Sequence, residues 1–507
     1  MRHIRQISLL TAILILAGAV ASCGNSETGG AQTTDDTGTT ANETTTSPLD
    51  PGIEAVDCGG REYTLLARVN GDSFCFPYAE FFAEEETGDP LNDAVYKRNN
   101  YIEEKYNLKL NIETVENVSF AAAASIMAGD NEYDIIFPSH QEAFEMMKKG
   151  QLLEVSDFPH VDISKPYWMR GVMDSTSVMG SRFFLTGDLN LQSLNSIGVI
   201  YFNKKLAEDN GVGDLYGMVR SGEWTLDKFS ECCRGVTADL DGDGLDADDR
   251  YGLTTNGFAW QPFLAGCGTT LIGKDKDGSF TFDWDSEKNV GIITHVISLL
   301  NDHESVMLVN QNAELQSKYG GIGEASIAMF REDRALFWIE MIYASAQQRD
   351  MNSDFGFLPM PKYDDRQESY MSYMHMGWST TSAVPVTNDD HDLTGRLLED
   401  MAWKSSETVR PAYYDRSLQG KISRDDDSGE MLDIIYSGLN IDPSIIMAAS
   451  LPIDAKMRGF LIDGKDSFIS EIAANKEKCV GLIEKINTTV EEVLQTQGKL
   501  AGSPRVR

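Results

Sequence analysis

The stretch "DPLNDAVYKRNNYIEEKYNLKLNIETV", residues 89–115, contains the signals of a helix followed directly by a strand. Asp89 is a favourable N-cap, and Pro90 fits the first helical turn because no N–H needs a partner there. The helix is expected to end at Asn107, a residue type found at helix ends. The residues after it alternate between apolar and polar, which predicts a strand over 108–115.

Three neighbouring segments extend this pattern. Short apolar runs predict strands over 62–69 and 133–138, and an alanine-rich segment predicts a helix over 119–129. The resulting order, β-α-β-α-β, indicates an α/β fold with parallel neighbours in its sheet. Ligands of such sheets bind beyond the carboxyl ends of the strands, so the loop "PSHQE", residues 138–142, is a candidate binding segment.

The middle of the chain continues the alternation of strands and helices. Residues 183–209 are expected to contain a strand, a polar stretch, a second strand and the start of a helix. Further on, Thr225 can cap a helix, and Trp224 before the cap can pack against Phe229. This contact is a hydrophobic staple, so Trp224 is expected to be structural. The segment "YGLTT", residues 251–255, predicts another strand.

The first residues have the pattern of a secretory signal. Residues 1–22 combine two arginines, an apolar run too short to span a bilayer comfortably, and small residues. They end at "VASC", which resembles the lipobox of bacterial lipoproteins; in that family the signal is removed before the cysteine, here Cys23, and its thiol carries lipid. The alternative is an ordinary signal peptide with Cys23 just beyond it. Residues 24–50 hold almost nothing apolar, so a lipid-attached, disordered tether is predicted over 23–52.

Composition and charge narrow the class of protein. The hydrophobic fraction is 41%, which is normal for a globular core, and about 450 residues after the tether suffice for two or three domains. The formal net charge is −36. A body this acidic is not expected to bind nucleic acid, whose phosphates need a basic face. An anionic membrane surface would repel it too, so the lipid on Cys23 is expected to anchor an extracytoplasmic body to the cell membrane.

The cysteines do not indicate a disulfide framework or a zinc site. Seven are present, and six remain when Cys23 is set aside. No CxxC pair and no cysteine–histidine ligand spacing occurs among them. Cys58 and Cys75 flank the first predicted strand and could form a bridge; the alternative is that both are free, buried thiols.

An aspartate-rich loop, "ADLDGDGLDADDRYGL" at 238–253, begins like a calcium loop of the EF-hand kind. The candidate ligands are Asp239, Asp241, Asp243, Leu245 through its carbonyl, Asp248 and Asp249. The twelfth position of an EF-hand is normally a bidentate glutamate, but here it is Arg250, so Asp248 or Asp249 would have to substitute. A strand is predicted after the loop in place of a second helix. Two interpretations stay open: a structural calcium that braces the loop, or a solvated acidic loop.

Several pieces of the chain, in order, resemble a known family. "WTLDKF…ADLDGDG…YGL" resembles the middle of the extracellular solute-binding proteins of ABC importers, in the large carbohydrate-binding family that includes maltodextrin-binding proteins. "VYKRNNYIEEKYNLKLNI" and "YDIIF…GQLLEVSDF" are similar to the family's first helices and strands. "FFLTGD…IYFNKKL", "EASIAMFREDRALFWIEM" and "FGFLPMPKYDDRQESYMSYMHMGWST" are similar to its crossovers between lobes and the strands that follow. No piece is a strict motif, but together they cover nearly the whole mature chain.

The resemblance implies an α/β, two-lobed periplasmic-binding-protein-like (type II) fold with the ligand cleft between the lobes. It assigns residues 53–190 and about 340–388 to lobe 1, and 191–339 and about 389–507 to lobe 2. Closure on a solute would present a surface to an ABC permease in the membrane. It also implies a monomer that needs no cofactor, apart from the structural calcium considered above, and does no chemistry on its solute.

A sugar cleft needs aromatic plates and polar groups that form short hydrogen bonds. The candidate ligand contacts are His140, Gln141, Asp188, Asn195, Ser196, Trp260, Trp338 and Trp378. The alternative for each tryptophan is core packing, which is the preferred interpretation of Trp168, and for each polar residue a role in a turn. Related maltodextrin binders carry an aromatic residue and an acid where Pro138 and Gln141 stand, so maltose is not assigned as the solute.

Other classes of protein fit the sequence less well. The segment "MSYMHM", residues 371–376, contains soft copper ligands, but it occurs once and is interpreted as strand packing. A surface glycan-processing enzyme would need two carboxylates across a cleft, and no GxSxG, HExxH or P-loop motif is present. A binding protein for a peptide or another non-sugar solute is the nearer alternative. The identities of the solute and the permease depend on loop positions that no motif specifies.

Overall fold

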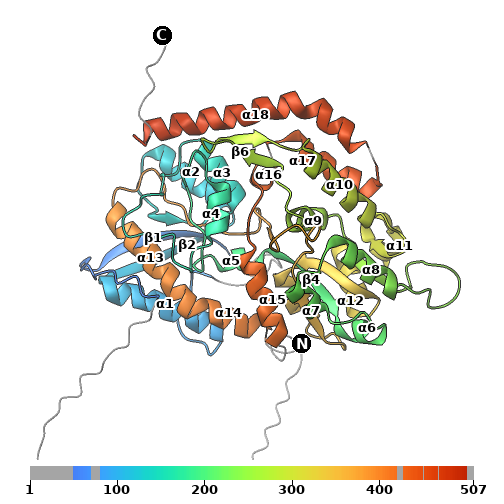
Figure 1. The fold of residues 1–507 in the computed structure, drawn as a ribbon. Coiled ribbons are helices and arrows are strands. Elements are labelled where there is room, and N and C mark those ends of the chain that lie inside the picture. The colour runs from blue at the N-terminus through green and yellow to red at the C-terminus, as the bar shows by residue number, and fades with distance from the viewer. Residues whose placement is uncertain (1–48, 70–79, 419–425, 449, 466, 500–507) are drawn as a thin grey trace, which may run out of the picture. The chain divides into compact units, whose positions relative to one another are not determined.

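The computed structural model describes residues 49–69, 80–418, 426–448, 450–465 and 467–499 (Figure 1). The predicted signal, Cys23, most of the predicted tether and Cys75 lie outside these ranges. Cys58 is a free thiol. Of the helices described, none combines the length and the apolar character that a membrane span requires.

The first half of the described chain forms the predicted β-α-β-α-β unit. Its three strands follow the order β2-β1-β3, and β1 is parallel to both neighbours. Strand β3 is shorter than predicted, because only two of its residues pair with β1. The elements are β1 (Arg61–Arg68), α1 (Pro90–Tyr106), β2 (Leu108–Val115), α2 (Val118–Ala128), β3 (Ile135–Ile136) and α3 (His140–Lys148).

Local hydrogen bonds explain why these helices begin and end where they do. The Asp89 carboxylate accepts the N–H groups of Leu91 and Asn92, both at 3.1 Å, which confirms the predicted N-cap. Asn107 ends α1 in the left-handed conformation, with φ of 45°. Helix α3 begins with a capping box, formed between Ser139 and the third residue of the helix.

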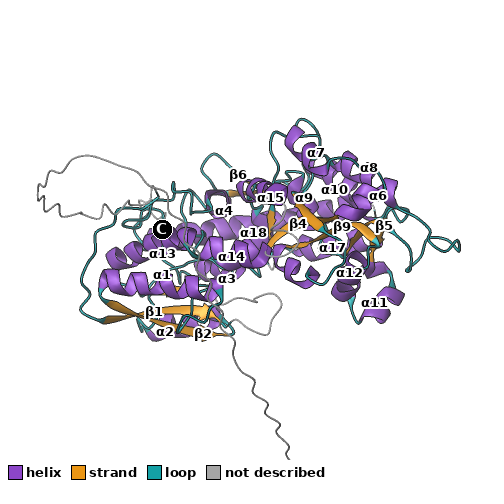
Figure 2. Ribbon diagram, turned by 90° about the horizontal axis from the view of Figure 1, so that it is seen from below, coloured by secondary structure: helices purple, strands orange, loops and turns teal. Residues whose placement is uncertain are grey.

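A larger mixed sheet is built from strands between residues 197 and 374. Its strands follow the order β10-β4-β9-β5-β8, and β11 pairs with β4. Strand β4 is antiparallel to β9, β10 and β11, whereas β5 is parallel to β8 and β9. Helices α8 (Leu226–Val236) and α12 (Ile322–Arg331) pack against this sheet (Figure 2). Its strands are β4 (Ile197–Asn203), β5 (Tyr251–Thr255), β8 (Val306–Leu308), β9 (Ala335–Met341), β10 (Phe355–Leu358) and β11 (Tyr373–Met374).

The hydrophobic staple is confirmed, and one predicted strand is not present. Trp224 is buried, and its ring centroid lies 5.8 Å from that of Phe229, while the Thr225 hydroxyl accepts the N–H of Lys228. The first strand predicted within 183–209 is replaced by isolated bridges, because its backbone pairs with other segments only at single positions.

The remaining elements complete the layers around the two sheets. They are α4 (Arg170–Thr176), α5 (Leu191–Asn195), α6 (Lys204–Asp209), α7 (Leu215–Ser221), α8 (Leu226–Val236), α9 (Trp260–Gly266), the hairpin β6 (Ile272–Lys274) and β7 (Phe280–Phe282), α10 (Glu287–Leu300), η1 (Val309–Gln311), α11 (Ala313–Tyr319), α12 (Ile322–Arg331), η2 (Ile342–Gln348), α13 (His391–Glu407), α14 (Val409–Leu418), α15 (Asp426–Ser437), α16 (Pro443–Ile446), α17 (Pro452–Asp463) and α18 (Phe468–Thr496).

Three segments depart from the predicted lobe boundaries. Strands β10 and β11 fall within the range assigned to lobe 1, yet their backbones pair with β4 of the larger sheet. Helix α13 falls within the range assigned to lobe 2, yet it packs with the small sheet, because Leu397 and Met401 join the core cluster that contains Tyr63 and Leu65. Tyr63 also donates a 2.7 Å hydrogen bond to Thr394 of α13. The chain therefore passes between the sheets more often than the predicted boundaries assume.

Candidate functional site

A cavity of about 670 Å³ opens where helix α3, which follows the small sheet, meets the end of strand β9 in the larger sheet. Its walls come from α3, the loop after β5, the junction of β9 with η2, residues 375–378 and helix α17. These segments lie far apart in the sequence, so only the folded chain contains the cavity. The lining side chains with chemistry relevant to binding are the polar Gln141, Asn256, Gln261, Glu340 and Arg458 and the aromatic Phe258, Trp260, Tyr343, His375 and Trp378.

Aromatic rings form one part of the wall. Trp378 and His375 stack with ring centroids 4.5 Å apart and planes inclined by 21°. Phe258 extends this stack, with its centroid 6.2 Å from that of His375, and Tyr343 meets Trp378 edge-on at 6.4 Å. The Trp378 carbonyl accepts a 2.9 Å hydrogen bond from the Gln192 amide, which holds the segment in place. The cavity is therefore lined by a preformed row of aromatic rings.

Polar groups stand beside these rings. Glu340 is buried near the end of β9, and burial raises the pKa of its carboxyl to about 7. Its Oε1 accepts the N–H of Met341 at 3.1 Å. The Gln141 amide nitrogen donates to the carbonyl of Ile445 at 3.0 Å. Burial lowers the pKa of His375 to about 4, so this ring is neutral at neutral pH.

Three of the predicted ligand contacts, Gln141, Trp260 and Trp378, line this cavity. Gln141 lies in the first turn of α3, beyond the carboxyl end of β3, where ligands of parallel sheets are expected. Trp260 begins α9 and is 4% exposed. The structure brings these residues together from segments more than a hundred residues apart.

His140 is adjacent to Gln141 in the sequence but lies in a different environment. Its ring is fully buried, with Nδ1 2.6 Å from the Ser379 hydroxyl and Nε2 2.8 Å from that of Thr186. Burial lowers the pKa of His140 to about 3. Both ring nitrogens are thus occupied by protein partners, and His140 is not among the residues that line the cavity.

The three polar candidates of the first crossover are also buried among protein partners. The Asp188 carboxylate pairs with Arg410, whose Nη1 is 3.3 Å from both carboxylate oxygens. Asn195 accepts a 2.8 Å hydrogen bond from the hydroxyl of Tyr413, and the Ser196 hydroxyl donates to a backbone carbonyl of α5. These contacts tie α5 and the preceding loop to helix α14.

Trp338 packs inside the fold, whereas a neighbour on the same strand reaches the cavity. Its ring is fully buried, with centroids 4.8 Å from Tyr201 and 5.6 Å from Phe330. Glu340 lies two residues further, on the same face of the strand by alternation, where the strand ends at the cavity. Strand alternation beyond Trp338 was the signal in the sequence that could have identified Glu340.

The methionine-rich segment has two faces. Met374 and Met376 are buried in the core, as the interpretation of strand packing predicts. His375 lies between them and points instead to the cavity. Trp168 is also buried, and its indole N–H donates to Glu399 at 2.9 Å, which confirms its packing role.

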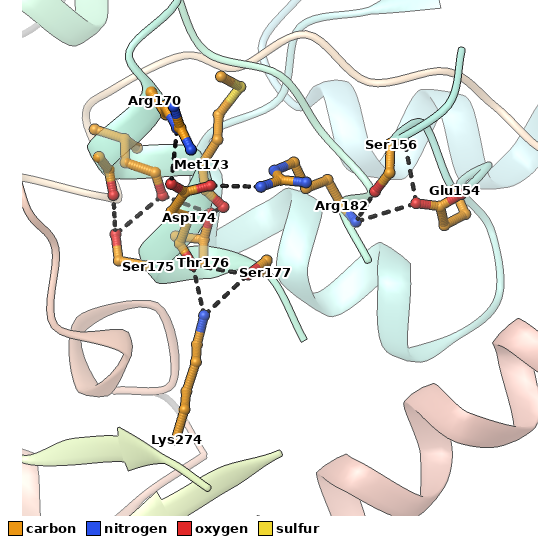
Figure 3. A network of polar contacts seen from close by, with 12 residues as sticks. Glu154, Ser156, Arg170, Met173, Asp174, Ser175, Thr176, Ser177, Arg182 and Lys274 are labelled. Carbon is orange, nitrogen blue, oxygen red and sulfur yellow. Dashed lines mark hydrogen bonds and ion pairs between the residues drawn. The ribbon is translucent and has the colours of Figure 1, made fainter. Parts of the chain in front are cut away.

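A second cavity, of about 350 Å³, lies between helix α4 and strand β6. Lys274 reaches across from β6, and its ammonium donates to the carbonyl of Asp174 at 2.5 Å and to the Ser177 hydroxyl at 3.0 Å (Figure 3). The Asp174 carboxylate in turn pairs with Arg170 and Arg182. Burial lowers the pKa of Lys274 to about 8. Asp174 is thus paired with two arginines, and the Lys274 ammonium is already held by a carbonyl and a hydroxyl. No aromatic ring is among the described residues of this wall, so the larger cavity is the stronger candidate.

The aspartate loop brings three of its predicted calcium ligands together. Asp239, Asp241 and Asp243 are exposed, and one carboxylate oxygen of each lies within 4.8 Å of the others. The Asp241 carboxyl raises the pKa of Asp243, as expected for acids in close contact. Leu245 is exposed at the end of this group. Hard oxygen donors at this spacing fit calcium.

The other two predicted ligands of the loop have protein partners. Asp249 is buried, and its carboxylate accepts the N–H groups of Leu240 at 2.7 Å and Asp246 at 2.8 Å. Asp248 pairs with Lys318 at 2.6 Å. The donor set of the loop is therefore smaller than predicted, and Asp249 serves to close the loop on itself.

Calcium at this loop stays a prediction. An ion held by three carboxylates would cancel their mutual repulsion, so about 10 mM calcium should stabilise the fold by about 1.4 kcal/mol at a dissociation constant of about 1 mM. The response of the thermal unfolding midpoint should disappear in Asp241→Asn and persist in Asp277→Asn, which alters another exposed acidic turn. Identical midpoints with and without calcium would contradict the prediction.

The chain resembles known proteins both in sequence and in fold. The family model described as "Bacterial extracellular solute-binding protein" matches residues 83–392. No curated protein sequence matches the chain. Among solved structures, a cyclo/maltodextrin-binding protein complexed with maltotetraose is similar, with a TM-score of 0.55, 15% identity, and coverage of 87% of this chain and 99% of that chain.

Two further solved structures are similar at lower scores. An ABC substrate-binding protein from Listeria monocytogenes in complex with cycloalternan has a TM-score of 0.48, 12% identity, and coverage of 87% of this chain and 99% of that one. A maltose/maltodextrin-binding domain from Bdellovibrio bacteriovorus bound to maltotriose has a TM-score of 0.45, 11% identity, and coverage of 86% and 100%. The likeness to the cyclo/maltodextrin-binding protein confirms the predicted two-lobed α/β fold.

Proposed function

The chain belongs to the bacterial extracellular solute-binding proteins, and from this premise we propose that it captures a sugar or oligosaccharide in the 670 Å³ cavity. The observation that carries the proposal is the row of aromatic rings formed by Trp378, His375 and Phe258, which lines the cavity together with the Glu340 carboxyl. Sugar rings present apolar faces that stack on aromatic rings, and their hydroxyls need hydrogen-bonding partners. The volume lies within the range of small-molecule sites.

Polar side chains of the cavity suit hydroxyl groups. The Glu340 carboxyl, with a pKa of about 7, can donate a hydrogen bond when protonated and accept one when ionised. The amides of Gln141 and Gln261 line the same space and offer both donors and acceptors. An oligosaccharide would use such groups to fix its orientation after stacking on the rings.

Binding is favoured over glycoside hydrolysis. A glycosidase needs two carboxyl groups flanking the scissile bond. Within the described part of the chain, Glu340 is the one acidic residue that lines the cavity. Release of reducing sugar from any glycoside by the purified protein would contradict this view.

We further propose that the protein is a lipid-anchored monomer that delivers its solute to an ABC permease. The support is the "VASC" sequence ending at Cys23, together with the family to which the chain belongs. Cys23→Ala should release the protein from the membrane fraction and abolish labelling with a fatty acid. Retention of the label would contradict the proposed attachment.

Replacing Trp378 with alanine should weaken sugar binding about thirtyfold, since losing a stacked indole costs about 2 kcal/mol. A thermal-shift screen of residues 51–507 against mono-, di- and oligosaccharides would first identify the ligand, and titration calorimetry would then compare the variants. Phe120→Ala is the matched control, because Phe120 is 76% exposed and outside the cavity.

The outcomes separate the site from the ligand class. Unchanged affinity in Trp378→Ala would show that the sugar binds elsewhere. If no sugar raises the unfolding midpoint, the carbohydrate assignment fails, and peptides and other non-sugar solutes become the alternatives to test.

A further inference from the structure

One cation in the wall of the large cavity has no hydrogen-bonding or ionic partner among the described residues. Arg458 of helix α17 lines the cavity, and its guanidinium forms no hydrogen bond or ion pair with any residue in the described ranges. The chain has 79 acidic residues against 43 lysines and arginines. In so acidic a protein, most exposed cations find a carboxylate; Arg220, for example, pairs with both Asp427 and Glu430.

The other titratable groups of the cavity wall do not neutralise this cation. Burial raises the pKa of Glu340 to about 7, so at pH 6 this carboxyl is mostly protonated. The pKa of His375 is lowered to about 4, so its ring is uncharged at the same pH. Burial raises the pKa of the Glu340 carboxyl, and the hydrogen bond from the N–H of Met341 lowers it; Arg458 has no effect on this pKa. At pH 6 the described wall therefore carries a net positive charge, which comes from Arg458.

The backbone opposite Arg458 is shaped to accommodate its side chain. A Cβ added at Gly257 would lie 3.4 Å from the Arg458 Nε and 2.9 Å from the Ile462 side chain. The N–H of Gly257 donates to the Asn310 side chain at 2.5 Å, which fixes this loop. The absence of a side chain at Gly257 thus lets the arginine lie against the loop beside the ring of Phe258.

We propose that the solute is an acidic sugar, an oligosaccharide carrying uronate carboxylates, and that Arg458 binds one of these carboxylates. This inference rests on the proposed function of the cavity. The planar guanidinium presents two parallel N–H groups that match the two oxygens of a carboxylate, which a neutral sugar does not offer. The aromatic row would hold the ring faces, and Arg458 would select for the charge.

The experiment compares an acid with its uncharged counterpart. Titration calorimetry at pH 6 and low salt would use digalacturonate, its dimethyl ester, and a sulfated disaccharide as a second anion. The acid should bind at least tenfold more tightly than the ester, and added salt should reduce the difference. In Arg458→Gln the acid and the ester should bind equally. Arg458→Lys should restore only part of the preference, because lysine keeps the positive charge but lacks the two parallel N–H groups of the guanidinium.

Arg234→Gln is the matched control. Arg234 is an exposed arginine on helix α8, 3.6 Å from Asp302, and it does not line the cavity. This variant should keep the full preference for the acid. Unfolding midpoints equal to that of the unmodified chain would show that each variant is folded.

The possible results distinguish the inference from the proposed function. If the ester or another neutral sugar binds as tightly as the acid, the acidic-sugar inference is overturned while the carbohydrate function stands. If the sulfated sugar binds and the uronate does not, the choice of carboxylate is wrong. If neither acidic nor neutral sugars bind, both the inference and the proposed function fail.

Discussion

Arg410→Met should lower the free energy of unfolding by about 3 kcal/mol at pH 7.5, because it leaves a buried carboxylate without its counter-charge. The Asp188 side chain is 4% exposed, and Arg410 is its cationic partner at 3.3 Å. Burial raises the pKa of Asp188 to about 6 even with Arg410 opposite. Urea denaturation followed by tryptophan fluorescence would measure the change.

The loss in Arg410→Met should depend on pH. The folded-state pKa of Asp188 lies above its unfolded value of 3.8, and removing the cation raises it further. A raised carboxyl pKa contributes stability that is present at low pH and lost as the pH rises through the folded value. The variant should therefore lose less stability at pH 5 than at pH 8.

Two variants control this prediction. Arg220→Met removes a cation whose ion pairs with Asp427 and Glu430 are exposed and screened by solvent, and it should cost far less stability than Arg410→Met. Adding Asp188→Asn to Arg410→Met should recover much of the loss, since no buried charge then remains. A loss in Arg410→Met that equals that of the surface variant, or that is the same at pH 5 and pH 8, would contradict the proposed role.

Acidification should destabilise the fold through His140. Its folded-state pKa is about 3, well below the value of 6.5 for an unperturbed histidine, because the ring is fully buried. A lowered histidine pKa contributes stability that is complete above the unfolded pKa and is lost as the pH falls toward the folded value. Between pH 7 and pH 4 this amounts to about 3 kcal/mol, at 1.36 kcal/mol for each pH unit.

The contribution of His140 is isolated by comparing variants across pH. Glu80 and Glu340, both with pKa values raised to about 7, stabilise the fold as the pH falls, opposite to His140. The change in unfolding free energy with pH is therefore the sum of these contributions. His140→Gln keeps polar groups that can face Ser379 and should show a shallower loss between pH 6.5 and pH 4. His160→Gln, at the surface beside Asp392, should keep the original slope. Identical slopes in both variants would show that His140 is not the group responsible.

Much of the fold was predictable because the relevant contacts are local. The cap formed by Asp89, the left-handed end of α1 at Asn107 and the staple between Trp224 and Phe229 all join residues within a few positions of one another. Their geometry therefore follows from residue type and spacing. The predicted lobe boundaries failed where long-range pairing decided the outcome, as when β10 joined β4.

The binding cavity was predictable only in part. Gln141 and Trp260 were predicted from their places after strands, and Trp378 from the family resemblance of its segment; the structure puts all three in the wall. Glu340, His375 and Arg458 were missed, because each becomes a cavity residue only through segments that approach from far along the chain. Strand alternation offered a signal for Glu340 and His375, whereas Arg458 lies on a helix of which no motif marks the exposed face.

The sequence by itself determined the family, the α/β class and the places where many helices begin and end. Only the tertiary structure decided which polar residues face a ligand and which serve the core. His140 and Gln141 show the difference: they are neighbours, yet one is enclosed by Thr186 and Ser379 and the other opens onto the cavity. The physical reason is that burial and hydrogen-bond partners come from residues hundreds of positions away, 239 for His140 and Ser379 and 304 for Gln141 and Ile445, so they depend on the packing of the whole chain.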